Sequence, residues 1–388
     1  QGAIVDFSDI SAYEDRQVAG VLEQLLNNRQ FMEILHEFKS LPEILSPGKS
    51  IPIETYFKKI ESVDAFQGIM FALLNDNITK TTRSLSYSGI ENLPEDSSFL
   101  FVSNHRSTSL DASYLNYILH FANRVTVYSG AGDNIFETDW LGHLIRLNKG
   151  FIIKRDVPDI DDKIIEAERL SRYIYSLLKS GRSVWISQQP GRAKNGMDKT
   201  DSVIITMLNK YQSGDKNYSE WLEEITLIPL CISWESIPCG LQMAKELNNA
   251  AEKSPFSDMR NILEEINSYK GNVHYHFCKR VQGKSRSEIV RLIDEQIINN
   301  YQLWDTNWLA FLKTTDVSGS DKKMILKSID EERTEKIFSE VLPFSAAVQK
   351  SYYEMYAHPV KSALQSVNSL GDLLEIHQEK EKQRERVR

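Results

Sequence analysis

A polar segment at residues 103–111 separates an apolar run from a helical pattern. It reads Ser103-Asn104-His105-Arg106-Ser107-Thr108-Ser109-Leu110-Asp111. A histidine can take a proton from a hydroxyl group when a carboxylate fixes its tautomer and stabilises the imidazolium. Asp111 is the nearest carboxylate after His105, so the two residues are a candidate general base and its orienting partner. The alternative is that Asp111 or Ser109 only caps the helix that follows.

Two further segments carry pairs of cations that could hold an anion. Lys154 and Arg155 follow an apolar run, and Arg192 and Lys194 follow Gly191. Clustered Arg and Lys side chains suit a phosphate group, and a glycine lets the backbone approach a ligand closely. Taken singly, each pair is also explained as solvated charge or an ordinary turn. Residues 140–200 nevertheless hold 12 Lys and Arg against 7 Asp and Glu, although the whole chain has a net charge of -8.

Alternating strand and helix patterns between residues 100 and 235 must position these segments. Strands are expected at residues 99–102, 125–128, 151–153, 183–187, 226–232 and 273–277. Helices are expected at residues 110–121, 161–178 and 203–211. In such folds ligands bind beyond the carboxyl ends of strands, which is where the polar segments lie. Pro229 removes a backbone donor from its strand, which predicts an edge strand or a bulge.

The 388 residues divide by pattern into three parts. We predict a helical N-terminal region at residues 1–95, an α/β core at residues 96–285, and a helical C-terminal extension with a charged tail at residues 286–388. The predicted fold class is α/β, with a mixed sheet flanked by helices.

Composition narrows the class of protein. The longest apolar run that we find, Ile69 to Leu74, has six residues, whereas a membrane-spanning helix needs about 20. This run is either core or a surface contact with lipid. The three cysteines suit a reducing compartment, and the acidic net charge argues against a general nucleic-acid binder. His274 and His276 share a strand face, but no further ligand cluster accompanies them, so no metal is expected.

Taken in order, four segments resemble the glycerolipid acyltransferases, the superfamily of the glycerol-3-phosphate and lysophosphatidate enzymes. They are the Asn-His…Asp segment at 104–111, the strand ending in Lys154-Arg155, the Gly191-Arg192-Ala193-Lys194 loop, and Ile228-Pro229-Leu230. The resemblance spans roughly residues 97–240 and is closest to the soluble plastid-type enzymes and soluble bacterial homologues. Two features depart from the usual pattern. Five residues instead of four separate His105 from Asp111, and Pro190 stands where many members have a glutamate.

The resemblance implies a glycerol-3-phosphate acyltransferase-like core and a role for each matching residue. His105 would be the general base of an HxxxxD-like motif, and Asp111 would orient it. The acceptor's phosphate would be bound by Lys154, Arg155, Arg192 and Lys194. The loop would be supported by Asn104, Arg106, Ser107 and Gly191.

The implied reaction moves a fatty acyl group to glycerol 3-phosphate or a related phosphorylated alcohol in phospholipid biosynthesis. Acyl-CoA or acyl carrier protein would deliver the acyl group as a co-substrate, with no other cofactor. The expected location is the cytoplasm, either free or peripheral at the inner face of a membrane. Two alternatives stay open. One is a lysophospholipid or specialised metabolite as acceptor, and the other is a non-catalytic acyl-thioester or acyl-carrier-protein binding module.

Overall fold

The computed structural model describes residues 6–37, 43, 47–48, 51–155, 157–213, 217–251, 257–382 and 384–387. The chain folds as two compact units, each built from separate stretches of sequence. The first comprises Gln1–Lys80 and Val125–Val184, and the second comprises Thr81–Arg124 and Trp185–Arg388. This division differs from the three sequential parts expected from pattern, which stay a prediction.

The first unit is mainly helical. Its helices are α1 (Asp15–Leu26), α2 (Arg29–Glu37), α4 (Ile53–Phe57), α5 (Val63–Thr81, ending at the first residue of the second unit), η2 (Asp133–Glu137), α7 (Asp139–Leu147) and α8 (Ile160–Lys179). Strands β3 (Tyr128–Gly132) and β4 (Gly150–Ile153) pair in parallel. The helical spacing of Val18, Leu22 and Leu25 in α1 buries all three side chains, as amphipathic spacing predicts.

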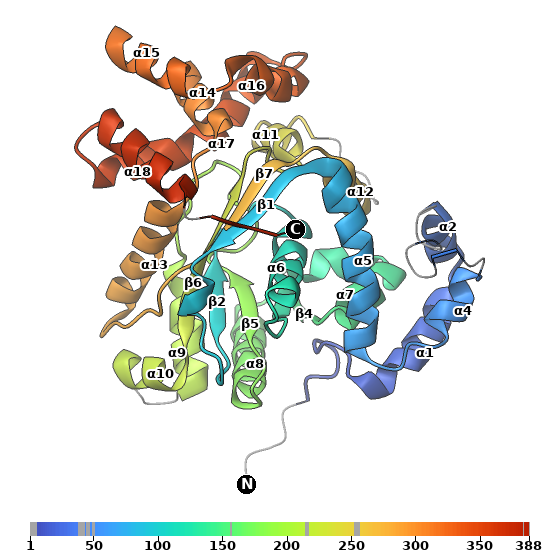
Figure 1. Ribbon diagram of the computed structural model, residues 1–388. Helices are drawn as coiled ribbons and strands as arrows, with labels where there is room; N and C mark the ends of the chain where they lie inside the picture. The colour runs from blue at the N-terminus through green and yellow to red at the C-terminus, as the bar shows by residue number, and fades with distance from the viewer. Residues whose placement is uncertain are drawn as a thin grey trace. The chain divides into compact units, whose positions relative to one another are not determined.

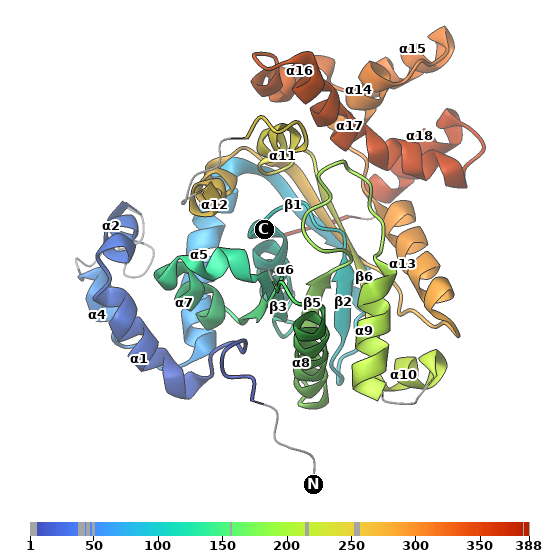
Figure 2. The ribbon, with the colours of Figure 1, turned by 180° about the vertical axis from the view of Figure 1, so that it is seen from behind.

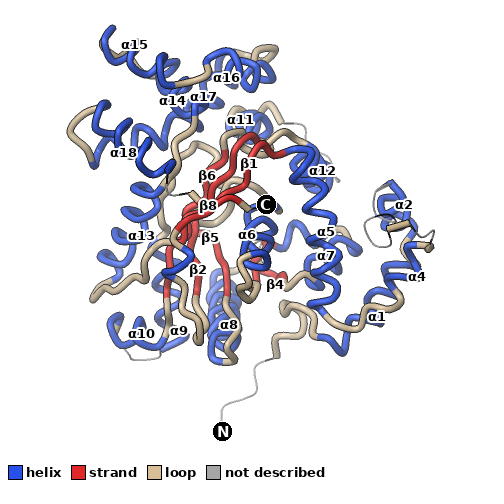
Figure 3. The backbone as a smooth tube through the Cα atoms, viewed as in Figure 1, coloured by secondary structure: helices blue, strands red, loops and turns tan. Residues whose placement is uncertain are grey.

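The second unit holds a mixed sheet. Its strands are β1 (Thr82–Ser88), β2 (Leu100–Ser103), β5 (Val184–Ser187, in this unit from Trp185), β6 (Leu227–Trp234), β7 (Gly271–Phe277) and β8 (Glu385–Arg386). Their order is β5-β2-β6-β7-β1-β8. The pairs β2–β6 and β1–β7 are parallel, whereas β6–β7 and β1–β8 are antiparallel. Figure 3 shows these strands together with helices around them. The predicted fold class, a mixed sheet flanked by helices, is confirmed.

The second unit also contains helices, and some of them cover the two faces of the sheet. They are η1 (Ile90–Asn92), α6 (Leu110–Phe121), α9 (Ser202–Ser213), α10 (Tyr218–Glu224), α11 (Gly240–Leu247), α12 (Ser257–Asn267), α13 (Arg286–Asn300), α14 (Asp305–Thr314), α15 (Gly319–Ser328), α16 (Glu331–Phe338), η3 (Ser339–Val341), α17 (Ala346–Ala363), η4 (Leu364–Ser366) and α18 (Leu370–Lys382). Helix α6 lies on one side of the strands, and α9 and α13 lie on the other (Figure 1 and Figure 2). The chain from Arg286 to Lys382 is largely helical, as its pattern predicts.

Two strands lie where the sequence indicates something else. Strand β1 falls in the region expected to be helical, and its sequence Thr-Arg-Ser-Leu-Ser-Tyr-Ser is too polar to resemble a buried strand. Its two larger apolar residues, Leu85 and Tyr87, do alternate with serines at the period of a strand. Strand β8 lies in the charged tail, where Glu385 and Arg386 pair with β1 at the edge of the sheet.

Pro229 lies in a central strand, so the expectation of an edge strand is wrong. Strand β6 runs between β2 and β7, and Pro229 pairs with Val102 of β2. The carbonyl of Pro229 accepts a hydrogen bond from the Cys278 N–H, which lies one residue beyond the end of β7. The N–H and C=O of one residue point to the same side of a strand, so a backbone N–H at position 229 would also point toward Cys278. The β6–β7 pairing ends at Leu230 and Phe277, so the N–H that proline lacks would lie beyond the last paired residues.

His274 and His276 are hydrogen-bonded to serines of the neighbouring strand. The Ser88 hydroxyl lies 2.9 Å from His274 Nε2 and 2.8 Å from His276 Nδ1, and Ser86 Oγ lies 2.9 Å from His274 Nδ1. Burial lowers the pKa of His274 and lowers that of His276 to about 4. This serine–histidine cluster between β1 and β7 therefore holds neutral imidazoles.

We expect the free energy of unfolding to fall as the pH drops from about 6.5 to about 4. The unfolded chain takes up protons at the ordinary histidine pKa of about 6.5, whereas folded His276 resists protonation down to about 4. The stabilisation is therefore complete above pH 6.5 and is lost on acidification. Thermal unfolding of His276→Gln should show a smaller decrease in Tm over this range than the unmodified chain. His120→Gln, which replaces an exposed histidine, is the control. An equal decrease in Tm for the unmodified chain and both variants would contradict the prediction.

Candidate active site

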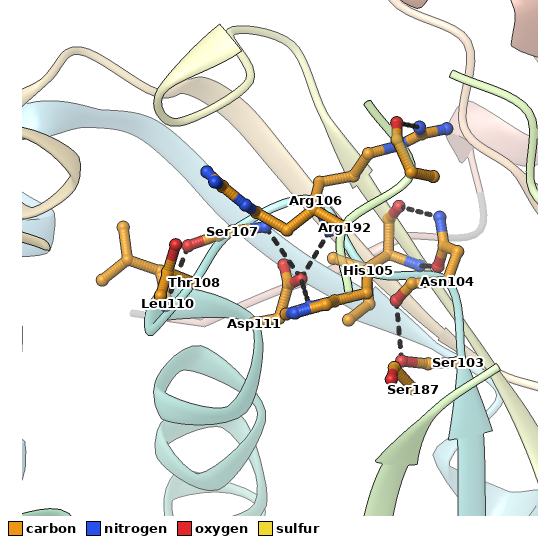
Figure 4. A network of polar contacts seen from close by, with 12 residues as sticks. Ser103, Asn104, His105, Arg106, Ser107, Thr108, Leu110, Asp111, Ser187 and Arg192 are labelled. Atoms are coloured by element: carbon orange, nitrogen blue, oxygen red, sulfur yellow. Dashed lines mark hydrogen bonds and ion pairs between the residues drawn. The ribbon is translucent and has the colours of Figure 1, made fainter. Parts of the chain in front are cut away.

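His105, in the loop between β2 and α6, forms a hydrogen-bonded pair with Asp111, in the first turn of α6. His105 Nδ1 lies 2.8 Å from Asp111 Oδ2 (Figure 4). Oδ2 also accepts hydrogen bonds from two backbone N–H groups, so it acts as an acceptor and the N–H of His105 Nδ1 is its donor. In that tautomer the ring lone pair lies on Nε2. The extra residue between His105 and Asp111 does not separate them.

The Asp111 carboxylate is held by donors on both oxygens. Oδ2 accepts from the backbone N–H groups of Arg106 at 2.8 Å and Ser107 at 3.0 Å. Oδ1 accepts from Trp234 Nε1 at 2.9 Å. The five-residue gap is absorbed because the loop turns two of its N–H groups toward the carboxylate. A side chain with these donors and only 1% exposure has one available orientation.

The other ring nitrogen of His105 is available to a ligand. The side chain is 11% exposed, and its ring lies against Trp185 with centroids 5.7 Å apart. None of the residues that the structure describes hydrogen-bonds Nε2. The pair therefore presents one acceptor nitrogen from a fixed imidazole, which is the geometry that a general base needs.

Glu265 of α12 holds the same loop from the opposite side. Its carboxylate accepts from the backbone N–H groups of Thr108 at 2.7 Å and Ser109 at 3.1 Å, and from the hydroxyls of Ser107 and Ser109. Glu265 is 0% exposed, and burial raises the pKa of its carboxyl. Glu265 was not predicted from the sequence, because nothing in the pattern of α12 distinguishes it from Glu264.

Asn104 and Arg106 anchor the loop to the rest of the second unit. The Asn104 amide donates to the Ile232 carbonyl at 2.9 Å and accepts from the Ile232 N–H at 2.8 Å, which extends the β2–β6 pairing. The buried Arg106 guanidinium donates to the carbonyls of Ala193 and Gly196 at 2.8 and 3.0 Å and to Asp198 at 2.7 Å. The Arg106 side chain therefore points away from solvent and joins the two loops.

The glycine–arginine loop lies beside the His105 loop. Gly191 adopts a φ of 77°, which favours glycine, and the Ala193 N–H donates to the His105 carbonyl at 2.9 Å. Arg192 lies between two carboxylates, 3.5 Å from Glu246 and 3.9 Å from Glu265, and Lys194 lies 2.8 Å from Glu246. Within the described part of the chain, the buried Arg192 Nη1 has no hydrogen-bond partner.

A family model described as Acyltransferase matches residues 84–232. These residues are an acyltransferase domain. The match contains the His105–Asp111 pair and both cationic segments, and it confirms the resemblance to the glycerolipid acyltransferase superfamily. The sequence matches none of the curated proteins.

Solved structures show low overall similarity to the chain. The 1-acyl-sn-glycerophosphate acyltransferase PlsC from Thermotoga maritima shares 14% identity at a TM-score of 0.35, covering 72% of this chain and 93% of that one. FtsY from Mycoplasma mycoides shares 12% identity at a TM-score of 0.23, covering 72% and 94%. At these TM-scores, neither similarity carries an argument.

The other predicted phosphate ligands of the acyltransferase domain lie in the first unit. Lys154 Nζ lies 2.8 Å from Asp9 and 3.2 Å from Glu166, and the hydrogen bond to Asp9 raises the pKa of Lys154. The Arg155 N–H donates to Asp133 at 3.1 Å. Lys154 thus belongs to an ion cluster of the first unit, and the role of both residues toward a phosphate stays a prediction.

Neither a membrane span nor a metal cluster is present in the described residues. None of their helices is long and apolar enough to cross a bilayer. Their His, Cys, Asp and Glu side chains form no group of three or more that could hold a metal ion.

Proposed function

We propose that the acyltransferase domain moves a fatty acyl group from an acyl thioester to the hydroxyl of a phosphorylated glycerol acceptor. The single observation that carries the proposal is the His105–Asp111 hydrogen bond of 2.8 Å, with Nε2 left without a partner among the described residues. The candidate acceptors are glycerol 3-phosphate and its 1-acyl derivative. The donor is acyl-CoA or acyl carrier protein, and the domain acts in the cytoplasm, either free or at the inner face of a membrane.

The proposed reaction is a direct transfer. His105 Nε2 takes the proton of the acceptor hydroxyl while the hydroxyl oxygen attacks the thioester carbonyl carbon. The carbon–sulfur bond then breaks, and the imidazolium returns its proton to the leaving thiolate. Asp111 stabilises the imidazolium, because its charge is fixed beside Nδ1 by three other donors. The acyl group ends as an oxygen ester and the donor as a free thiol.

The acceptor's phosphate would bind Arg192 and Lys194. Arg192 follows directly on Gly191 and lies in the loop that hydrogen-bonds the His105 backbone. A guanidinium with a free donor atom suits a phosphate oxygen. Glu246 is the competing anion, since it pairs with both cations.

The test is an assay of thiol release by the purified chain, with palmitoyl-CoA and palmitoyl-acyl carrier protein as donors. Glycerol 3-phosphate, 1-acylglycerol 3-phosphate and unphosphorylated glycerol are the acceptors, and mass spectrometry identifies the products. We expect an acylated phosphorylated glycerol and little reaction with glycerol. A His105→Ala preparation controls for contaminating enzymes. Donor binding without thiol release from any acceptor would instead support a binding module, and an equal kcat/KM for glycerol would refute phosphate recognition.

The Glu246→Gln variant should bind the phosphorylated acceptor more tightly. The substitution removes the carboxylate that lies 2.8 Å from Lys194 and 3.5 Å from Arg192, so both cations become available to phosphate. Ion pairs that are partly exposed contribute roughly 0.2–1 kcal/mol, so the KM for the acceptor should fall about twofold to fivefold with little change in kcat. Steady-state kinetics with varied acceptor measures this, and Glu295→Gln on exposed α13 is the control. A raised KM in Glu246→Gln would show that Glu246 positions Arg192 instead.

A further inference from the structure

A polar pocket of about 640 Å³ lies in the second unit, away from the His105 loop. It is formed by residues of β1, β7, β8, α14, α16 and α18 and by the segments next to them, and no residue of the His105 or Gly191 loop lines it. Its volume is in the range of small-molecule sites. Figure 1 shows β8 lying across β1 on this unit. The acyltransferase reaction proposed above makes no use of this pocket.

Four arginines and three carboxylates line the pocket, so its wall carries one net positive charge. Arg333 pairs with Glu235 and Asp305, and Arg384 pairs with Glu381. The exposed Arg83 and Arg386 have no hydrogen bond or ion pair to any described side chain. They come from the neighbouring strands β1 and β8, where Arg386 lies opposite Ser86.

Two buried donor atoms of the same wall also lack hydrogen-bond partners among the described residues. Trp304 is 5% exposed, and its buried Nε1–H has no hydrogen-bond partner among the described residues. The buried Nη1 of Arg333 likewise has none in that part of the chain. Buried donors in folded proteins are nearly always paired, so donors that stay unpaired around one pocket call for an acceptor. Arg384 lies over the Trp304 ring at 5.0 Å.

We propose that this pocket binds the phosphate group of a small phosphorylated ligand. A phosphate monoester carries close to two negative charges and several acceptor oxygens, which match two unpaired guanidinium groups and an indole N–H. The ligand is either a free phosphorylated metabolite or the headgroup of an anionic lipid, since both present the same group.

The experiment measures binding of inorganic phosphate to the full chain by isothermal titration calorimetry. In the Arg192→Gln background, which disables the proposed acceptor site, phosphate should still bind. Adding Arg83→Gln and Arg386→Gln should weaken that binding at least about tenfold, because two charge-assisted hydrogen bonds are lost. The matched control adds Arg286→Gln and Arg291→Gln, which replace two exposed arginines of α13. This control should change the affinity for phosphate less than about twofold.

One further variant and a vesicle-binding measurement complete the test of this pocket. Trp304→Phe removes only the indole N–H and should weaken phosphate binding several-fold, which decides the matter should the arginine variant fail to fold. Cosedimentation with phosphatidic acid vesicles, compared with phosphatidylcholine alone, separates a lipid headgroup from a free metabolite. Phosphate binding that is unchanged by both Arg83→Gln/Arg386→Gln and Trp304→Phe would overturn the proposal. Binding abolished by Arg192→Gln alone would also overturn it, and would leave the proposed acyltransferase function intact.

Discussion

The His105→Ala variant should lose acyl transfer by a factor of about 10²–10⁴ in kcat, the usual contribution of a positioned general base. Nε2 of His105 is the one ring nitrogen that stays available, because Nδ1 is held by Asp111 at 2.8 Å. The acceptor's phosphate would bind Arg192 and Lys194 and not His105, so the KM for the acceptor should change little. Thiol release from acyl-CoA at saturating acceptor measures the effect.

Two controls accompany this prediction. His120→Ala removes an exposed imidazole from α6 and should keep full activity. The circular dichroism spectrum and Tm of His105→Ala should match those of the unmodified chain, because the ring edge faces the site and its removal leaves the loop's bonds to Asp111 and Glu265 in place. Unchanged turnover in folded His105→Ala would disprove its role as the base.

The Arg106→Met variant should lose about 3–5 kcal/mol of unfolding free energy, the cost of leaving a buried charge without its partner. Arg106 is 0% exposed and donates to Asp198 and to two carbonyls of the 193–196 loop. Burial raises the pKa of Asp198, and the charge of Arg106 opposes that rise. Without Arg106, Asp198 must be buried as an unpaired anion or take up a proton. Urea denaturation at pH 7 measures the loss.

The pH dependence of this loss identifies its cause. Asp198 in Arg106→Met should have a folded-state pKa raised further above its unfolded value, so the folded variant binds the extra proton. Its penalty is then full near neutral pH and shrinks on acidification, and the difference from the unmodified chain should narrow toward pH 5. Arg291→Met breaks an exposed pair with Glu295 and should cost at most about 1 kcal/mol. Equal losses in the two variants would refute a buried-charge penalty.

The sequence determined the local parts of the site. Short apolar runs at residues 99–102 and 226–232 predict buried strands, and β2 and β6 are buried throughout. A polar segment directly after such a strand lies at the carboxyl end of the sheet, which places His105 just ahead of α6 and Asp111 in the first turn of that helix. Strand β1 escaped prediction because its sequence is too polar to resemble a buried strand, and its pairing with β7 makes it part of the sheet.

Only the tertiary structure decided how that site is held and which of its charges are free. Trp234 and Glu265 hydrogen-bond the His105 loop from more than 120 positions along the chain, and no local spacing connects them to it. In the sequence, Arg106 resembles the other cations of these loops. In the structure it is buried and anchors the loop at residues 193–196. Arg192 is paired with Glu246, whereas Arg83 has no ion pair with any side chain that the structure describes. Residue type and local periodicity can be taken directly from the sequence. The burial of a side chain and its hydrogen-bond or ion-pair partners depend on which distant segments the fold brings into contact.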